Sequence, residues 1–231
     1  MSTPSTTPPP ATLVATRRSL HAVAELLMAG PQHRLAGTIR LAVTSDGFGT
    51  VALTGDPSRL EVRGVSLLVN RPSGTVIVPL AGTIAELADA VGVEPGAPVG
   101  VYTDTTGADE ASVVAVDEAA ARTILAALAR GDEALRRFAA RHQGQDPPPP
   151  VLWPEHFDVG ISLDEVNYGV SPGDSFLAEP YAYVGPWSPR RGLFWSQPFG
   201  AAQPMSSLAD DEALMGFFEA GRDAAATDPP A

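Results

Sequence analysis

The sequence predicts an α+β fold, an antiparallel β meander covered by helices, with a C-terminal half of strands and loops. Between residues 38 and 80 apolar residues recur with a period of two, the spacing of half-buried strands. Helical spacing of apolar residues occurs at 16–29, 83–91 and 117–141. Ten of the 15 aromatic residues lie between Trp153 and Phe199, which marks the C-terminal half as aromatic-rich.

The composition excludes several classes of protein and of site. At 231 residues, 44% hydrophobic and 18% charged, the chain suits one or two soluble globular domains. It has no cysteine and no lysine, which excludes disulfides, thiolate metal sites and Schiff-base chemistry. The net charge of −12 opposes nonspecific binding to nucleic acid or anionic lipid. No nucleic-acid partner is therefore expected. Because the sequence has no long apolar run and no signal peptide, we expect no membrane partner and a cytoplasmic location.

Composition also changes along the chain. Residues 1–15 are rich in Ser, Thr and Pro and are expected to form a disordered tail. An α+β region follows at 16–142, and then a stiff spacer at 143–150 that ends in four prolines. The aromatic-rich region, 151–222, is expected to pack on the first region, and 223–231 to fray.

The first helix is predicted at residues 16–29. Thr16 would cap it, and Gly30-Pro31 would end it. His21 and Glu25 are four residues apart on one flank of the apolar face. This spacing predicts a surface pair that contributes a few tenths of a kcal/mol at most.

The strands of the meander are predicted from period-two alternation and the turns between them. Residues 38–44 and 49–53 form the first pair, and strands near 60–62, 65–69 and 75–80 follow.

The remaining elements are predicted from caps and apolar spacing. Thr83 and Glu86 form a capping box for the helix at 83–91. Short strands are expected near 99–102 and 112–116. Asp117 would cap the next helix, with a break or kink at Gly131, and a last helix is predicted at 210–221.

The aromatic-rich region begins with a polar cluster around Glu155. If Trp153–Asp158 is a strand, Trp153, Glu155 and Phe157 share one side, and His156 and Asp158 share the other. If instead Pro154 opens a turn, this alternation does not hold. His156 and Asp158 could form a general-base pair or two metal ligands, or a hydrogen-bonded polar rim.

Further along, residues 167–174 read as a loop of turn-forming residues that presents Asn167 and Asp174. Tyr181 and Tyr183 face one way and, with Trp187, could stack on a ring or pack in a core. Phe194, Trp195 and Phe199 are expected in the core. The candidate ligand-binding residues are Trp153, Glu155, His156, Asp158, Asn167, Asp174, Tyr181, Tyr183 and Trp187.

No catalytic residue is identified, because the sequence contains no recognised catalytic motif, such as GxSxG. The histidines lack zinc-binding spacing. Oxygen ligands for Ca²⁺ or Mg²⁺ could come from Asp164, Glu165, Asn167 and Asp174, but their spacing matches no EF-hand loop. No metal or other cofactor is therefore expected.

Three classes of function remain open. The first is binding of a small polar molecule by residues 153–187. The second is an enzyme using carboxylate or His–Asp acid–base chemistry, with two of Glu155, His156, Asp158, Asp174 and Glu179 meeting in a cleft. The third is a noncatalytic interaction module, whose aromatic residues would form an anchor patch or a homo-oligomer interface.

Several short sequence segments are distinctive when taken together: LWPEHFD at 152–158, NYGVSPGD at 167–174, EPYAYVGPW at 179–187 and FWSQPFG at 194–200, with GTIRL at 37–41 and DGFG at 46–49. Together they resemble an uncharacterised family of actinobacterial proteins. The resemblance covers residues 17–222. It implies a source with a G+C-rich genome and no particular activity, cofactor or site residue.

Overall fold

The computed structural model describes residues 8–53 and 58–231, so residues 1–7 of the expected disordered tail lie outside the described part. The fold is α+β with an antiparallel meander, as predicted. Within the described residues the main sheet has ten strands, in the order β12-β11-β10-β9-β8-β1-β2-β3-β4-β5, and every neighbouring pair is antiparallel. Its strands are β1 (Leu41–Thr44), β2 (Gly47–Thr50), β3 (Arg59–Arg63), β4 (Ser66–Arg71), β5 (Gly74–Pro79), β8 (Val151–Trp153), β9 (Asp158–Leu163), β10 (Val166–Ser171), β11 (Tyr181–Pro186) and β12 (Ala201–Pro204).

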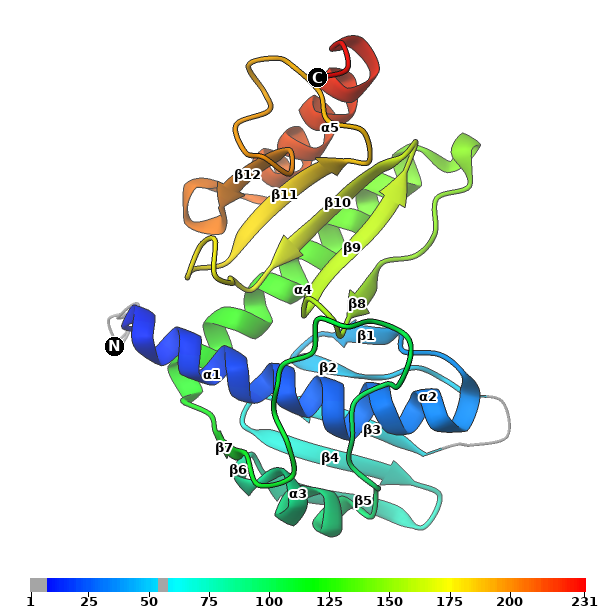
Figure 1. Cartoon of the computed structure of the whole chain (residues 1–231), viewed down its shortest axis with the longest axis vertical. Helices are drawn as coiled ribbons and strands as arrows, with labels where there is room; N and C mark the ends of the chain where they lie inside the picture. Colours follow the sequence, from blue (N-terminus) through cyan, green and yellow to red (C-terminus); the bar gives the residue numbers. More distant parts are fainter. Residues whose placement is uncertain (1–7, 54–57) are drawn as a thin grey trace.

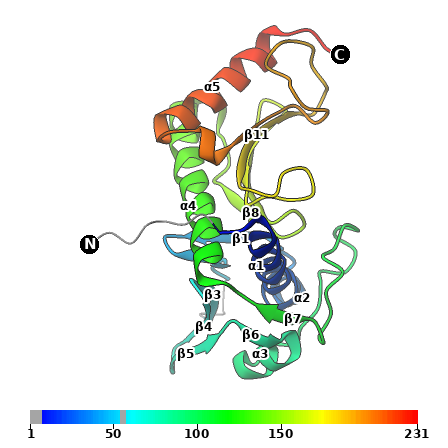
Figure 2. The ribbon, with the colours of Figure 1, turned by 90° about the vertical axis from the view of Figure 1, so that its left-hand side faces the viewer.

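Helices lie on both sides of this sheet (Figures 1 and 2). The continuous helix α1–η1–α2 (Pro10–Val23, Ala24–Ala29 and Gly30–Ala36) crosses the half that contains β1–β3. The long α4 (Glu118–Arg141) and α5 (Asp211–Thr227) lie on the opposite side. On the side of α1, strands β9–β11 are covered by loops and not by a helix. This difference leaves room for a cavity beside α1.

The first helix is longer than predicted at both ends. It begins at Pro10, and Gly30-Pro31 does not end it, because η1 has π-helical hydrogen bonding. In that register the carbonyl of Leu26 would accept from the amide of residue 31, but residue 31 is proline and has no N–H to donate. The amide of Gly96 donates to the Leu26 oxygen instead, at 3.0 Å. Gly30 allows this approach, because a Cβ there would overlap the Gly96 carbonyl oxygen.

The capping box of α3 (Ile84–Val91) is confirmed, with both hydrogen bonds between Thr83 and Glu86 present. The predicted strand near 112–116 is confirmed as β7 (Val113–Ala115), which pairs with β6 (Ala81–Thr83). The segment 99–102 is a turn, not a strand.

Two expectations about the later helices were wrong. Asp117 caps α4 as predicted, but the helix passes through Gly131 without a break. A Cβ at Gly131 would lie 2.7 Å from Val170 Cβ, so this glycine allows the helix to approach the sheet. Helix α5 is capped by Asp210 and continues past Gly221 to Thr227. Its C-terminal end is held by the indole N–H of Trp195, which donates to Asp228 at 2.9 Å.

The proline-rich spacer leads into β8, whose Leu152 pairs with Leu41 of β1. The strands before and after the spacer therefore belong to one sheet. On β9–β11, alternate residues face α4 and α5 and are buried: Val159, Ile161, Leu163, Tyr168, Val170, Ala182 and Val184. The residues between them face the side that no helix covers.

Candidate functional site

A cavity of about 880 Å³ lies between α1 and the uncovered face of β9–β11. Its walls come from the strands, from α1, from the turn between β8 and β9, and from the loop between β10 and β11. Residues 104 and 105, in the long loop after α3, complete it. The cavity therefore brings together segments that are far apart in the sequence.

The floor of the cavity is a polar strip across three strands. In the sheet register Gly160 of β9 faces Gly169 of β10, which faces Tyr183 of β11. Because neither glycine has a side chain, the Tyr183 ring lies across both strands, and a Cβ at Gly169 would overlap it. The Tyr183 hydroxyl thus reaches β9 and donates to Asp158 Oδ2.

Asp158 is the most unusual polar group in this strip. Its side chain is buried, with only 7% of the residue exposed, and its second oxygen, Oδ1, has no hydrogen-bond partner in the described part of the chain. Burial raises the pKa of Asp158 to about 6, an effect that the Tyr183 hydroxyl and nearby His156 partly oppose. Burial also raises the pKa of Tyr183 well above its usual value, so the phenol keeps its proton. A buried carboxylate with an unsatisfied oxygen is costly for a fold and points to a functional role.

The turn between β8 and β9 supplies Glu155 and His156 to the cavity wall. The strand interpretation of Trp153–Asp158 was wrong, and the alternative with a turn at Pro154 is confirmed. The Phe157 amide donates to the Trp153 carbonyl at 2.8 Å, and Phe157 has a φ of +54°. Glu155 Oε2 is buried and, like Asp158 Oδ1, has no hydrogen-bond partner within residues 8–53 and 58–231.

This turn is held in place by helix α1. The His21 ring stacks on Phe157, with centroids 5.3 Å apart, and its Nε2 donates to the Pro154 carbonyl at 2.6 Å. Burial lowers the pKa of His21. The prediction that His21 and Glu25 form a surface pair was therefore wrong. Glu25 is buried and accepts hydrogen bonds from Tyr102 at 3.1 Å and from the Thr106 amide at 3.0 Å. It thereby fixes the loop that carries residues 104 and 105.

The opposite wall combines an ordered loop with aromatic rings. Asp174 Oδ1 accepts from the amides of Phe176 at 2.8 Å and Leu177 at 3.1 Å, and Oδ2 accepts from the Tyr181 hydroxyl at 2.7 Å. Phe176 contacts Tyr181 and Phe199 edge to face, at centroid distances of 5.6 and 5.2 Å. Phe176 and Phe199 line the cavity although 45% and 42% of each residue is exposed.

Seven of the nine candidate residues line this cavity: Glu155, His156, Asp158, Asn167, Asp174, Tyr181 and Tyr183. The other two lie outside it. Trp153 packs beneath the guanidinium of Arg40, at 5.9 Å, and Trp187 is 63% exposed. The Trp187 indole N–H donates to Asn167 Oδ1 at 3.0 Å, so Trp187 reaches the site only through Asn167. Glu179 also lies outside the cavity lining and accepts from Ser206 at 2.8 Å.

The loop predicted at 167–174 is a strand up to Ser171, because β10 pairs along its length with both β9 and β11. Phe199 was expected in the core and instead lies in the cavity wall. Arg17, His21 and Phe176 also line the cavity and were not among the candidates. For Arg17 and His21 the signal was available, since both are polar residues on a helix whose opposite face is apolar.

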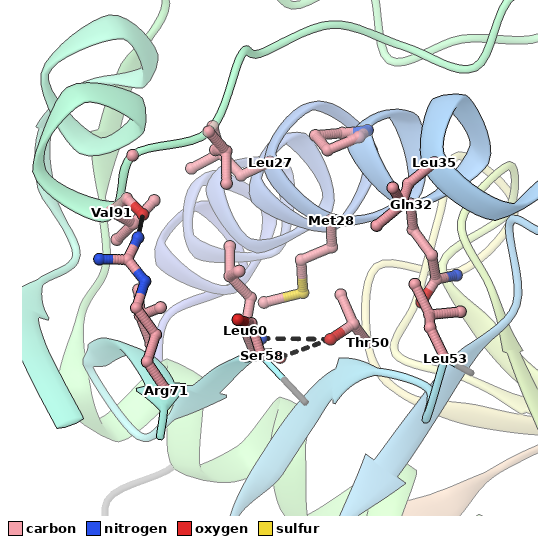
Figure 3. Close-up of a pocket in the computed structure, with 14 residues that line it drawn as sticks. Leu27, Met28, Gln32, Leu35, Thr50, Leu53, Ser58, Leu60, Arg71 and Val91 are labelled. Atoms are coloured by element: carbon pink, nitrogen blue, oxygen red, sulfur yellow. Dashed lines mark hydrogen bonds between the residues drawn. The ribbon is translucent and has the colours of Figure 1, made fainter. Parts of the chain in front are cut away.

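A second cavity, of about 200 Å³, lies under η1 and α2 (Figure 3). Its walls are mainly apolar, with Leu27, Met28 and Leu60 among them. Its buried amide, Gln32, is fully used within the protein. Gln32 donates to the carbonyls of Thr38 and Arg40 at 3.0 and 2.8 Å and accepts from the Val51 amide at 2.9 Å. This cavity offers a ligand little directional chemistry.

The oxygen ligands suggested for Ca²⁺ or Mg²⁺ are not brought together. Asp164 accepts from Arg222 at 3.3 Å and Gln145 at 3.2 Å at one end of β10, and Asp174 follows the other end of that strand. Throughout residues 8–53 and 58–231, no three acidic, histidine or cysteine side chains are grouped as metal ligands would be. Among those same residues, every helix is too short or too polar to span a bilayer.

The chain matches no protein-family model, no curated protein and no solved structure. These comparisons assign it no family and no function. Its function therefore has to be argued from the geometry and charge of the site.

Proposed function

We propose that this protein binds a small polar molecule in the cavity between α1 and β9–β11. One observation carries the proposal: the buried Asp158 carboxylate borders the cavity, with one oxygen held by Tyr183 and the other without a hydrogen-bond partner among the described residues. An acceptor left in this way costs about 1–3 kcal/mol or more, and a bound donor would recover that cost. The cavity volume, about 880 Å³, is in the range of small-molecule sites.

The rest of the wall fits such a ligand. Glu155 Oε2 is a second buried acceptor to which no described residue donates, and the partly exposed rings of Phe176 and Phe199 offer an apolar surface. A few polar groups beside aromatic side chains are typical of ligand pockets. The strands and the Asp174-held loop keep these groups in fixed positions.

Mass spectrometry and thermal shift test this proposal. Small molecules released on denaturing the purified protein would be identified by mass spectrometry. Thermal shift would then measure binding of polar metabolites, grouped as amines, sugars and nucleosides. Asp158→Asn and Phe176→Ala should remove the bound molecule and its thermal shift. Trp187→Ala is the matched control, because Trp187 is an exposed aromatic residue outside the cavity. If no molecule copurifies with or shifts the wild type, or if all three variants behave alike, the proposal fails.

A second candidate function is acid–base catalysis in the same cavity. The observation that favours it is the pKa of Asp158, which burial raises to about 6, within the range where a carboxyl group exchanges protons near neutral pH. His156, Glu155 and Asp174 line the same cavity. Incubating the protein with a metabolite extract should then deplete one compound in the wild type and leave it unchanged with Asp158→Asn. A copurifying molecule that remains chemically intact during this incubation favours binding alone.

A further inference from the structure

We propose that the ligand of this cavity is an organic amine, a protonated nitrogen carried on an aromatic or other apolar body. This inference rests on the proposed binding function and specifies the chemical class of the ligand. It follows from the acidic end of the cavity, from its aromatic wall, and from the absence, among the described residues, of an ion pair to either carboxylate at the acidic end.

The acidic end consists of Asp158 and Glu155, each with a buried oxygen that no donor of the described residues reaches. The two carboxylates are close enough that the negative charge of Glu155 disfavours ionisation of Asp158. Among the described residues, no arginine or histidine nitrogen lies within 4.0 Å of either one. A hydroxyl ligand would satisfy the acceptors and leave the charge uncompensated. An ammonium group supplies up to three donors and the opposite charge.

Two of the protein's own basic residues near the cavity, Arg17 and His21, are used elsewhere or carry little charge. Arg17 donates to the Ala178 carbonyl at 3.3 Å and lies beside Asp174, at the end of the cavity formed by the β10–β11 loop. His21 is held on Pro154, and burial lowers its pKa, which favours the neutral ring at pH 7. The exposed His156 is the remaining titratable base beside Asp158. Neither Arg17 nor His21 therefore neutralises the acidic end. Arg18, an exposed residue that also lines the cavity, has no nitrogen within 4.0 Å of Asp158 or Glu155.

The aromatic wall provides for the rest of the molecule. Tyr181, Phe176 and Phe199 form a row of edge-to-face contacts along the cavity. Exposed fractions of 45% for Phe176 and 42% for Phe199 leave apolar ring surface that a ligand could cover. Burial of an apolar body is favourable, and aromatic faces also attract cations.

A metal ion fits the acidic end less well. Hard divalent cations take six or more oxygen ligands. Here Asp158 Oδ2 is occupied by the Tyr183 hydroxyl, and no third acidic or histidine side chain is grouped with Asp158 and Glu155 as a ligand in the described residues.

Isothermal titration calorimetry at pH 7.5 tests the proposal with three probes. They are 2-phenylethylamine, the neutral 2-phenylethanol and the ringless propylamine. Wild-type protein should bind 2-phenylethylamine at least tenfold more tightly than either of the others. Asp158→Asn, an isosteric change, should reduce the preference for amine over alcohol to less than threefold. Phe176→Ala should weaken 2-phenylethylamine at least fivefold and leave propylamine unchanged.

The controls separate this inference from the proposed function. Trp187→Ala should retain wild-type affinity, and circular dichroism would verify the fold of each variant, with Glu155→Gln as a second variant if Asp158→Asn does not fold. If alcohol and amine bind equally and Asp158→Asn weakens both, the cavity binds polar molecules and the amine assignment is wrong. If the wild type binds no amine probe at millimolar concentration, the amine assignment is also wrong. The copurification experiment then decides the binding function independently.

Discussion

At the scale of single residues, Asp158 should lower the stability of the fold at neutral pH. Burial raises its pKa to about 6, while the unfolded chain has the ordinary value of about 3.9. The native state holds this proton more tightly, so its stabilising effect is complete below pH 4 and is lost as the pH rises through 6. At pH 8 the Asp158→Asn variant should therefore unfold at a higher urea concentration than wild type. Its free energy of unfolding should be larger by about 1–3 kcal/mol, and this difference should disappear near pH 4.

Urea titrations at pH 4, 6 and 8 measure this difference. Asp89→Asn, at an exposed position on α3, is the control and should change stability little at any pH. An Asp158→Asn variant that is less stable than wild type at pH 8 would contradict the prediction. A stabilising change at a residue needed for binding is the trade-off expected of a functional site.

Sequence reasoning named several of the residues that line the cavity and missed how they meet. Aromatic density and nearby carboxylates located seven of the cavity residues, and strand alternation placed Tyr181 and Tyr183 on one face. The crossing of Tyr183 over Gly169 and Gly160 depends on the register of three strands. That register is set by side-chain burial on the far side of the sheet, against α4 and α5, and no local pattern states it.

At the scale of elements, the contact of α4 with the sheet depends on Gly131. A Cβ there would lie 2.7 Å from Val170 Cβ and 3.0 Å from Val159 Cγ1, closer than packed carbon atoms normally approach. Gly131→Ala should improve helix propensity by about 1 kcal/mol, but overpacking typically costs 1–3 kcal/mol. We expect a net loss of up to about 2 kcal/mol in the free energy of unfolding, measured by chemical denaturation.

Gly216 in α5 provides the matched control, because it is also inside a helix and a Cβ there would meet nothing within 4 Å. Gly216→Ala should stabilise the protein by about 0.5–1 kcal/mol. If both substitutions stabilise to the same extent, the close approach of α4 to the sheet does not constrain residue 131.

The elements that were predicted well depend on local chemistry. The capping box of α3 and the Asp117 cap of α4 involve residues three positions apart. The elements predicted poorly depend on distant partners. The first helix continues through Gly30-Pro31 because the Gly96 amide, 70 residues from Leu26 along the chain, takes the place of the missing proline donor. A helix-end rule based on neighbouring residues has no access to that contact.

At the scale of the whole molecule, the two parts of the sheet, β1–β5 and β8–β12, meet where β8 pairs with β1, and this pairing is called the join. Strand β8 pairs with β1 through Leu41 and Leu152, and α4 packs against strands on both sides of this join, β1 and β2 as well as β9 and β10. The four prolines before β8 mark a change in composition, and sequence alone does not show that the sheet continues across it. Pairing between strands about 110 residues apart is set by packing of the completed sheet.

The join should make the chain unfold as one cooperative unit, and the tryptophans allow a direct test. All three, at 153, 187 and 195, follow the spacer, so their fluorescence reports only the C-terminal part, while far-ultraviolet circular dichroism reports the helices and strands of both parts. The two signals should change at the same urea concentration. Leu152→Ala removes a fully buried side chain and should lower both midpoints together, at a cost of about 2–5 kcal/mol.

Val99→Ala is the control for this substitution, because Val99 is 87% exposed and its truncation should shift neither midpoint. In a two-state protein, different probes give coincident transitions. A fluorescence transition in Leu152→Ala that precedes the change in circular dichroism would show that the C-terminal strands unfold separately. In that case the strand floor of the cavity could unfold while the α1 wall stays folded. Ligand binding would then raise the midpoint of the C-terminal transition selectively.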